Sequence, residues 1–231
     1  MYKLFEKKKK KTDYDYLKEL GFQISKKEYE HAIKRVDSFF NSKLSSNEDK
    51  RLYLESLIKI VKMDLQQEHL AWFLYGNRDK AGGYSTFYFP TECKDNNGNN
   101  INIRSSTQKK QLDLKKECVL VRPWEDSRLL GHIKRESDFK YDDMNHKGNY
   151  YRGLDITVIY NGLHSITDCI LNRDKGSIIV DELYCDEFFD FIYTDGEYWY
   201  NSYDNSVISV VIDFRIAILF EFNKRLIQLK K

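Results

Sequence analysis

The residue types best suited to chemistry gather in one short segment, residues 156–171, which reads ITVIYNGLHSITDCIL. Its apolar beginning predicts a buried strand, Asn161 and Gly162 predict a turn, and the remainder predicts a helix. The first amides of that helix would be free, and together with the helix dipole they favour a bound anion such as phosphate. Those amides belong to Leu163, His164 and Ser165. The segment therefore predicts a phosphate-binding turn, with a tight turn capped by Ser165 as the structural alternative.

Two histidines and an aspartate could supply proton transfer and metal binding near such a phosphate. His164 can donate to phosphate or transfer a proton near neutral pH. The polar stretch DDMNH, residues 142–146, adds His146 as a second proton carrier and Asp143 as an oxygen ligand for Mg²⁺. Its composition is also typical of a solvated turn. Asp168 lies four residues after His164, so the two would share a helix face.

The other histidines and the glycine-rich stretch carry weaker signals. His31 and His69 fall within helical stripes, which indicates structural roles, whereas His132 lies four residues after Arg128 on one predicted helix. Residues 76–83 lack the spacing of a phosphate loop. The sequence has no nucleophile elbow, H-E-x-x-H pair, EF-hand loop or dinucleotide-binding glycine fingerprint, which disfavours a nucleophilic hydrolase and a dinucleotide oxidoreductase.

The order of these elements resembles the ParB/sulfiredoxin-like superfamily over residues 118–183. In that superfamily a strand, a G-x-H-[R/S] turn and a helix follow an earlier strand and an arginine-bearing helix. The resemblance implies that Gly162, His164 and Ser165 hold nucleotide phosphates and that Arg128 neutralises their charge. Ser165 stands where the family usually has a final arginine, so the resemblance bears on phosphate binding more than on triphosphate turnover. Four strings also resemble an uncharacterised bacterial family of unknown function: PWEDSRLLGHI, DDMNH, NGLHSI and TDGEYWY.

Charge divides the chain into two unequal parts. Residues 1–124 carry a net charge of +8 and residues 125–231 a net charge of −6, although the whole chain is only +2. Residues 177–214 contain nine acidic side chains and no lysine or arginine, so they predict a surface that repels a phosphate backbone. DNA would then bind the N-terminal part or a local cationic pocket. The lysine run at residues 7–11 is typical of a solvated tail or of a nucleic-acid-binding arm.

Helices are predicted for most of the first third of the chain. Residues 1–12 form a basic flexible tail in this interpretation, and residues 13–80 form a helical region. Residues 25–28 match a capping box, S-x-x-E, ahead of an apolar stripe at helical spacing. A second stripe begins near Asn47 and ends near Gly76, where a helix would stop.

Strands and helices alternate in the remainder, residues 81–231. Asp195 and Gly196 predict a hairpin, a polar loop is predicted over residues 138–153, and residues 207–229 predict a helix with a strand pair as the alternative. The predicted strands cover residues 84–89, 118–121, 154–160 and 177–183. The fold class is therefore α+β: an N-terminal helical layer, then a mixed β-sheet domain closed by a long C-terminal helix, in one compact unit.

Cysteine spacing and hydropathy favour a cytoplasmic protein. The four cysteines show no C-x-x-C spacing and no secretory signal precedes them, so we expect them to be reduced. The longest apolar run, residues 207–222, is interrupted by Asp213, Arg215 and Glu221. Charges at the centre of a span are costly, so this run predicts a buried element and no membrane partner.

Taken together, these patterns predict a protein that binds a nucleotide or another phosphate ligand. As an enzyme of phosphoryl transfer or phosphodiester cleavage, it would hold phosphate at Gly162 and the following amides, and Arg128 would neutralise charge. His164 or His146 would move protons, and Asp143 would hold Mg²⁺. The alternative is a non-enzymatic, nucleotide-sensing or DNA-associated module of a bacterial defence or maintenance system. A third hypothesis is an adaptor that binds a protein partner through its helical region or its acidic, aromatic strands.

Overall fold

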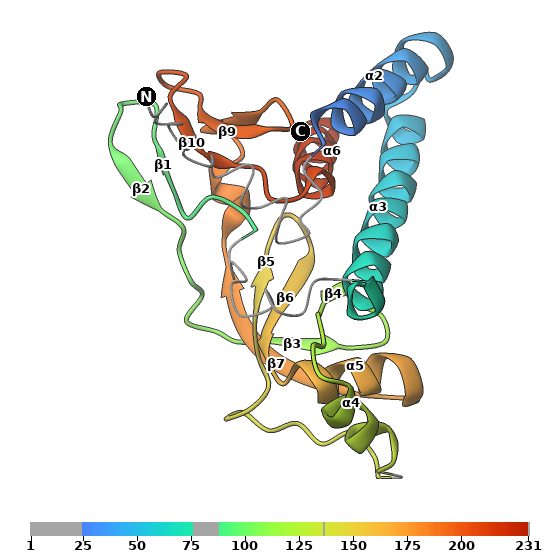
Figure 1. The fold of residues 1–231 in the computed structure, drawn as a ribbon. Helices are drawn as coiled ribbons and strands as arrows, with labels where there is room; N and C mark the ends of the chain where they lie inside the picture. The colour runs from blue at the N-terminus through green and yellow to red at the C-terminus, as the bar shows by residue number, and fades with distance from the viewer. Residues whose placement is uncertain (1–24, 76–87, 136, 231) are drawn as a thin grey trace, which may run out of the picture.

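The computed structural model describes residues 25–75, 88–135 and 137–230 (Figure 1). Two long helices, α2 (Lys26–Lys43) and α3 (Asn47–Tyr75), lie along one side of a mixed β-sheet, and the C-terminal helix α6 (Phe214–Lys230) packs against both. A smaller sheet and a two-stranded ribbon lie at the end of the molecule near α2 and the end of α6 (Figure 1). The predicted α+β class is confirmed. The predicted tail at residues 1–12, the helix stop at Gly76 and most of the strand at residues 84–89 lie outside the described residues.

The N-terminal helices form where the apolar stripes predict them. Helix α2 begins after Ser25, although the Ser25 side chain makes no capping hydrogen bond, so the capping box is not formed. Helix α3 is capped by Ser46, whose Oγ accepts the amide of Asp49 at 3.0 Å. The buried stripe of α3 consists of Leu54, Ile58, Leu65, His69 and Trp72.

The central sheet has five strands in the order β3-β7-β5-β6-β4 and mixes parallel with antiparallel pairs. Its strands are β3 (Lys110–Asp113), β4 (Val119–Leu120), β5 (Lys147–Tyr151), β6 (Ile156–Asn161) and β7 (Ser177–Leu183). Neighbouring residues of a strand enter different cores, as the strand period of two requires: Leu120 and Val158 face α3 and α6, whereas Val119 and Ile159 face α5 (Leu163–Asn172). Helix α4 (Asp126–Ile133) follows β4 and packs on α5.

The predicted polar loop over residues 138–153 is wrong in its second half, because β5 occupies residues 147–151 at the centre of the sheet. The sequence KGNYY has no apolar alternation, so the pattern gave no strand signal. Gly148 fits because a Cβ there would lie 2.8 Å from both the Ile159 side chain and the Val158 carbonyl oxygen. Close approach of a neighbouring strand therefore requires glycine at this position.

The predicted helix over residues 207–229 is also partly wrong. Residues Val207–Val210 form strand β10, in agreement with the alternative reading of that stretch, and α6 begins only at Phe214. Asp213 caps α6, since its Oδ1 accepts the amide of Arg215 at 2.9 Å. The predicted hairpin at Asp195 and Gly196 is confirmed, because β8 (Ile192–Thr194) and β9 (Tyr198–Asn201) pair across it. The ribbon consists of β1 (Glu92–Lys94) and β2 (Asn100–Asn102), and a 3₁₀ turn, Cys185–Phe188, follows β7.

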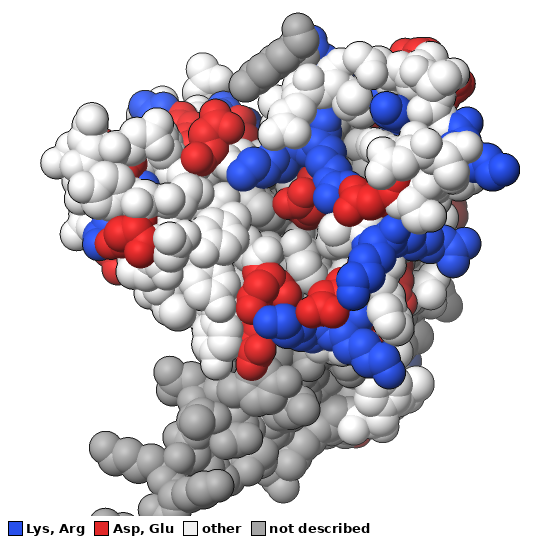
Figure 2. Space-filling model, turned by 90° about the horizontal axis from the view of Figure 1, so that it is seen from above, with Lys and Arg blue, Asp and Glu red and all other residues white. Residues whose placement is uncertain are grey.

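The acidic stretch does not form a uniformly negative surface. Most of its carboxylates pair with cations that come largely from the N-terminal half of the chain, and Figure 2 shows blue and red side chains interspersed on one face. The pairs are Lys109–Asp181, Arg152–Asp186, Arg104–Glu187, Lys26–Asp195, Lys94–Asp204 and Arg215–Asp213. Exposed pairs contribute little stability each. Their effect is to cancel the charge asymmetry that the sequence shows between its two parts.

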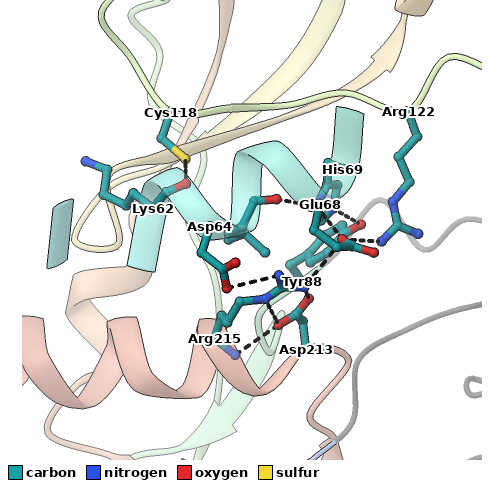
Figure 3. Close-up of polar contacts among 10 residues, drawn as sticks. Lys62, Asp64, Glu68, His69, Tyr88, Cys118, Arg122, Asp213 and Arg215 are labelled. Atoms are coloured by element: carbon teal, nitrogen blue, oxygen red, sulfur yellow. Dashed lines mark hydrogen bonds and ion pairs between the residues drawn. The ribbon is translucent and has the colours of Figure 1, made fainter. Parts of the chain in front are cut away.

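A buried network of charges joins α3, the segment after β4 and the start of α6 (Figure 3). Glu68 Oε2 on α3 lies 3.4 Å from Arg122 Nη2 and 3.3 Å from Arg215 Nη2. Arg215 Nη2 also donates to Asp213 Oδ2 at 2.7 Å, and Asp213 is fully buried. Burial by itself raises the pKa of Glu68, but His69, Arg122 and Arg215 outweigh it and hold that pKa at about 2.

All four cysteines are free and buried within the described residues. No helix in the described part of the chain is long and apolar enough to span a membrane.

We expect Glu68→Gln to lower the free energy of unfolding by about 3 kcal/mol, because both guanidinium groups lose a buried anionic partner. Urea denaturation at neutral pH measures the change. The matched control is Glu48→Gln: Glu48 pairs with Arg51 at the surface, where solvent screens the pair, so its loss should have little effect on stability. Equal effects of the two substitutions would contradict a central role for Glu68.

The depressed pKa of Glu68 also predicts an acid transition. A carboxylate whose pKa is lowered by folding contributes stability above its unfolded pKa, and that contribution disappears as the pH falls towards the folded value. The wild-type protein should therefore lose about 3 kcal/mol between pH 4.5 and pH 2 from this group. The loss measured for Glu68→Gln over the same range should be smaller by that amount.

Candidate functional site

The turn between β6 and α5 has the geometry that the sequence predicts. Strand β6 ends at Asn161, Gly162 adopts φ +78°, and α5 begins at Leu163. The first helical hydrogen bond runs from the Ile166 amide to the Gly162 carbonyl oxygen at 3.0 Å. The amides of the three residues before Ile166 therefore precede the helical ladder and face outward from the helix end. The tight turn therefore coexists with three amides that lie outside the helical ladder, although His164 itself is buried.

His146 lies directly against this turn. A Cβ on Gly162 would come within 2.5 Å of His146 Cδ2, so the imidazole occupies the space that a side chain would need. His146 Nδ1 accepts the Asp142 amide at 3.0 Å, and its Nε2 lies 2.8 Å from Ser165 Oγ. The Ser165 hydroxyl in turn donates to the Gly162 carbonyl oxygen at 3.0 Å. The loop that holds His146 is thereby fastened to the first turn of α5.

The directions of these bonds fix the form of the imidazole. Because Nδ1 accepts an amide hydrogen, the single ring proton of neutral His146 lies on Nε2, which donates to Ser165. Burial lowers the pKa of His146, which favours this neutral form. The structure brings His146, Ser165 and Gly162 together as predicted. Their polar atoms, however, are already bonded to one another.

His164 and Arg128 meet on another side of the turn. His164 Nε2 accepts the backbone amides of Trp124 at 3.3 Å and Glu125 at 3.0 Å, which ties α5 to the start of α4. The Trp124 and His164 rings meet edge to face at 5.5 Å, and the Arg128 guanidinium lies 5.1 Å from the centre of the Trp124 ring. Burial lowers the pKa of His164, and the charge of Arg128 lowers it further. Arg128 is also paired with Glu125 at 2.8 Å.

Asp168 does not join His164. Its carboxylate accepts both Nε and Nη2 of Arg173, at 3.0 and 2.8 Å, and the Asn172 amide at 2.9 Å. Arg173 Nη2 also donates to the carbonyl oxygens of His132 and Arg135 at the end of α4. Asp168 and Arg173 therefore fasten α5 to α4, and His132 takes part through its backbone.

The loop of residues 138–146 separates two open grooves. The first groove, of about 720 Å³, lies over β5, the end of β6 and β7, and includes the side chains of Lys109, Tyr141, Asp143, Lys147, Tyr160 and Asp181. The second, of about 360 Å³, lies between the loop and the helices α4 and α5. Tyr141, Asp142 and His146 line both, so this loop is their common wall.

The first groove holds polar groups that folding leaves available. Lys147 and Asp143 form no ion pair or side-chain hydrogen bond with any residue that the structure describes, whereas Lys109 pairs with Asp181. Residue Tyr160 is 41% exposed, and the Tyr141 hydroxyl donates to the Ile179 carbonyl oxygen at 3.2 Å. The groove thus combines a free ammonium group, a free carboxylate and two accessible aromatic rings.

Asp143 alone cannot enclose a metal ion. No group of three or more histidine, cysteine, aspartate or glutamate side chains suited to a metal occurs among the described residues. Mg²⁺ commonly uses one or two protein carboxylates, with water and ligand phosphates completing its octahedron. Asp143 fits that arrangement, in which the ligand itself carries the ion into the groove.

The sequence did not predict most residues of the first groove, among them Lys109, Tyr141, Lys147 and Tyr160. Lys109 immediately precedes β3, and the antiparallel pairing of β3 with β7 brings it to the groove. Lys147 is the first residue of β5, the strand that the sequence did not predict. On β6 the first four residues are buried and Tyr160 and Asn161 are exposed, so no alternation in the sequence pointed to Tyr160.

The fold and the groove define an α+β protein with a five-stranded mixed sheet and a polar groove over β5, the end of β6 and β7, which the residues of the Gly162 turn do not line. Residues 4–231 match the model of a family of unknown function, DUF6710, and the chain belongs to that family. No curated protein and no solved structure matches the chain. The similarity to the ParB/sulfiredoxin-like superfamily remains a prediction.

We expect Gly162→Ala to destabilise the protein by more than about 1–2 kcal/mol. The left-handed backbone alone costs that much for a residue with a Cβ, and the new methyl group would collide with His146. Thermal unfolding measures the loss. In the control, Gly131→Ala in α4, the added Cβ meets nothing within 4 Å and should stabilise the helix by up to about 1 kcal/mol. A neutral effect of Gly162→Ala would contradict the described packing of the turn.

Proposed function

We propose that this protein binds a nucleotide, or a closely related phosphate ligand, as its Mg²⁺ complex in the first groove. The observation that supports this most directly is the free ammonium group of Lys147 beside free Asp143 and the exposed Tyr160 ring, on a groove of about 720 Å³. A groove of this size accommodates a nucleotide-sized molecule. Lysine acts as a point charge on phosphate, and an aromatic ring offers a stacking surface to a base.

The charge of the groove argues for the metal complex over the free anion. Lys109 and Asp181 neutralise each other, which leaves Lys147 against the carboxylates of Asp142 and Asp143. A metal-free triphosphate would therefore meet a slightly negative groove. Mg²⁺ on the phosphates would remove that repulsion, with Asp143 as the protein oxygen nearest the ion in this proposal.

The arrangement of the histidines supports binding without turnover. Both ring nitrogens of His146 are bonded within the protein, and His164 is not among the residues that line the first groove. A general acid or base must reach the reacting group through a free ring nitrogen. The proposal is therefore a nucleotide-binding module, in which Lys147 contacts phosphate and Tyr160 contacts the base.

Isothermal titration calorimetry with ATP, GTP and CTP, each with and without Mg²⁺, tests this function. We expect binding of at least one nucleotide that weakens when Mg²⁺ is withheld. Lys147→Ala should weaken it by about 1.5–3 kcal/mol, roughly ten- to a hundredfold in affinity, because a charge-assisted contact is lost. The matched control is Lys59→Ala, which removes an exposed lysine from α3 and should leave affinity unchanged.

The base contact is tested with Tyr160→Ala against tripolyphosphate, which has no base. Loss of a stacking ring should weaken nucleotide binding by about 1–3 kcal/mol and leave tripolyphosphate binding unaltered. Tyr203→Ala, at an exposed tyrosine outside the groove, controls for the substitution itself. Absence of binding for every nucleotide with Mg²⁺, or equal affinity of wild type and Lys147→Ala, would refute the proposal. Release of inorganic phosphate would show turnover instead.

A further inference from the structure

One imidazole joins the common wall of the two grooves to α5. The wall is the loop of residues 138–146, and His146 at its end bonds to Ser165 at the start of α5. Tyr141 and Asp142, which line both grooves, lie four or five residues before His146. His146 is therefore one of the contacts that position these wall residues; another is the bond from the Tyr141 hydroxyl to the Ile179 carbonyl oxygen at 3.2 Å.

The hydrogen bonds of His146 suit only the neutral ring. The Asp142 amide is a donor and cannot accept, so a proton added to Nδ1 would face another N–H at 3.0 Å. Protonation would remove this bond within the loop, whereas the bonds from the Asn145 and His146 amides to the Asp142 carbonyl oxygen, at 3.2 and 2.7 Å, would remain. The second bond, from Nε2 to Ser165, survives in either form, since Nε2 carries hydrogen in both.

Packing adds to this preference. The His146 side chain is buried, with the Phe139 ring at 4.9 Å and the Tyr141 ring at 6.0 Å between ring centres. A charged imidazole in this setting loses hydration. Burial accordingly lowers the pKa of His146; the negative charge of Asp142 opposes this and the charge of His132 adds to it.

The charged groups around His146 are balanced. These charged groups belong to the loop, to α4 and α5 and the residues that follow each helix, and to the start of β5. The anionic groups are Asp138, Asp142, Asp143 and Asp168, and the cationic or titratable groups are His132, Arg135, Lys140, Lys147 and Arg173. Asp168 and Arg173 neutralise each other. The remaining groups give no strong excess of negative charge that would hold a proton on His146.

We propose that His146 is a proton-operated latch: its neutral ring accepts the Asp142 amide and so holds Tyr141 and Asp142 in the wall of both grooves. Its protonation breaks that bond and loosens this part of the loop, while Nε2 stays bonded to Ser165. This inference deepens the proposed function, on which it rests for the ligand, because it adds a regulation of the same groove. The latch is closed above the pKa of His146 and opens as the pH falls through it. Ligand binding in the first groove then weakens with acid, by up to about tenfold for each pH unit below that pKa.

Two measurements test the latch without any ligand. Nitrogen-15 NMR of the imidazole at pH 7.5 should show neutral His146 with its hydrogen on Nε2. Hydrogen exchange should show that the protection factor of the Asp142 amide, and of the loop around it, falls at least tenfold between pH 7.5 and pH 4.5. A hydrogen on Nδ1, or protection that does not change with pH, would overturn the proposal.

His146→Gln provides the non-titrating variant and His31→Gln, on the exposed face of α2, the matched control. Loop protection should become independent of pH in His146→Gln and keep its wild-type pH dependence in His31→Gln. Equal pH dependence in both variants would assign the effect to another group. The NMR and wild-type exchange results need no variant, so they can refute the latch even if His146→Gln fails to fold.

Calorimetry with Mg²⁺ and the nucleotide identified above then separates the latch from the proposed function. Affinity should fall between pH 7.5 and pH 4.5 in wild type and in His31→Gln, and remain level in His146→Gln. If exchange and NMR show the latch but no nucleotide binds at any pH, the proposed function fails and the latch stands. If a nucleotide binds with an affinity that is independent of pH in wild type, the latch fails and the proposed function stands.

Discussion

The buried carboxylate of Glu68 is the point at which three separate parts of the chain are fastened together. It comes from α3, it faces Arg122 from the segment that leaves β4, and it faces Arg215 from the first turn of α6. Burying charges costs several kcal/mol for each ion unless partners compensate it. The guanidinium groups therefore specify where α3 can lie, because any displacement would leave a buried charge without its partner (Figure 3).

This constraint sets the frame for the rest of the molecule. With α3 fixed against β4 and α6, the apolar residues of both helices close one face of the central sheet, while α5 closes the other. The same folding brings the positively charged first half of the chain against the negatively charged second half, where Lys26, Arg104 and Lys109 each pair with a carboxylate. The sequence has two oppositely charged regions, but in the folded protein their charges form ion pairs with one another on the surface. The ammonium group of Lys147 has no ion-pair partner among the described residues, which is why our proposal assigns it to the phosphate of a ligand.

The turn at Gly162 illustrates how one small residue links the structure to the regulation that we propose. Glycine is needed there for two independent reasons, the left-handed backbone and the space taken by His146. The buried imidazole of His146 occupies this space between the loop and α5. Its Nδ1 accepts a hydrogen bond from the Asp142 amide, and its Nε2 donates one to Ser165. A fixed direction of hydrogen bonding makes the contact sensitive to one proton. The chemistry predicted for His146, proton exchange, is thus retained in our proposal but acts on the loop and not on a substrate.

Local patterns in the sequence determined the elements with strong periodicity: α2, α3, the β6–α5 unit, β7 and the hairpin at Gly196. The sequence also determined that Gly162, His146, His164 and Arg128 would be of interest, because their types are rare and their spacing is typical of a turn before a helix. It could not reveal β5, whose polar residues are tolerated in the centre of the sheet, or the start of α6, which depends on a cap by Asp213. Only the tertiary structure decided the groove, since Lys109 reaches it through the β3–β7 pairing and the Glu68 network joins residues more than fifty positions apart. Propensity and periodicity act over a few residues, whereas the partner of a charge or of a strand edge is chosen by which distant segments pack together.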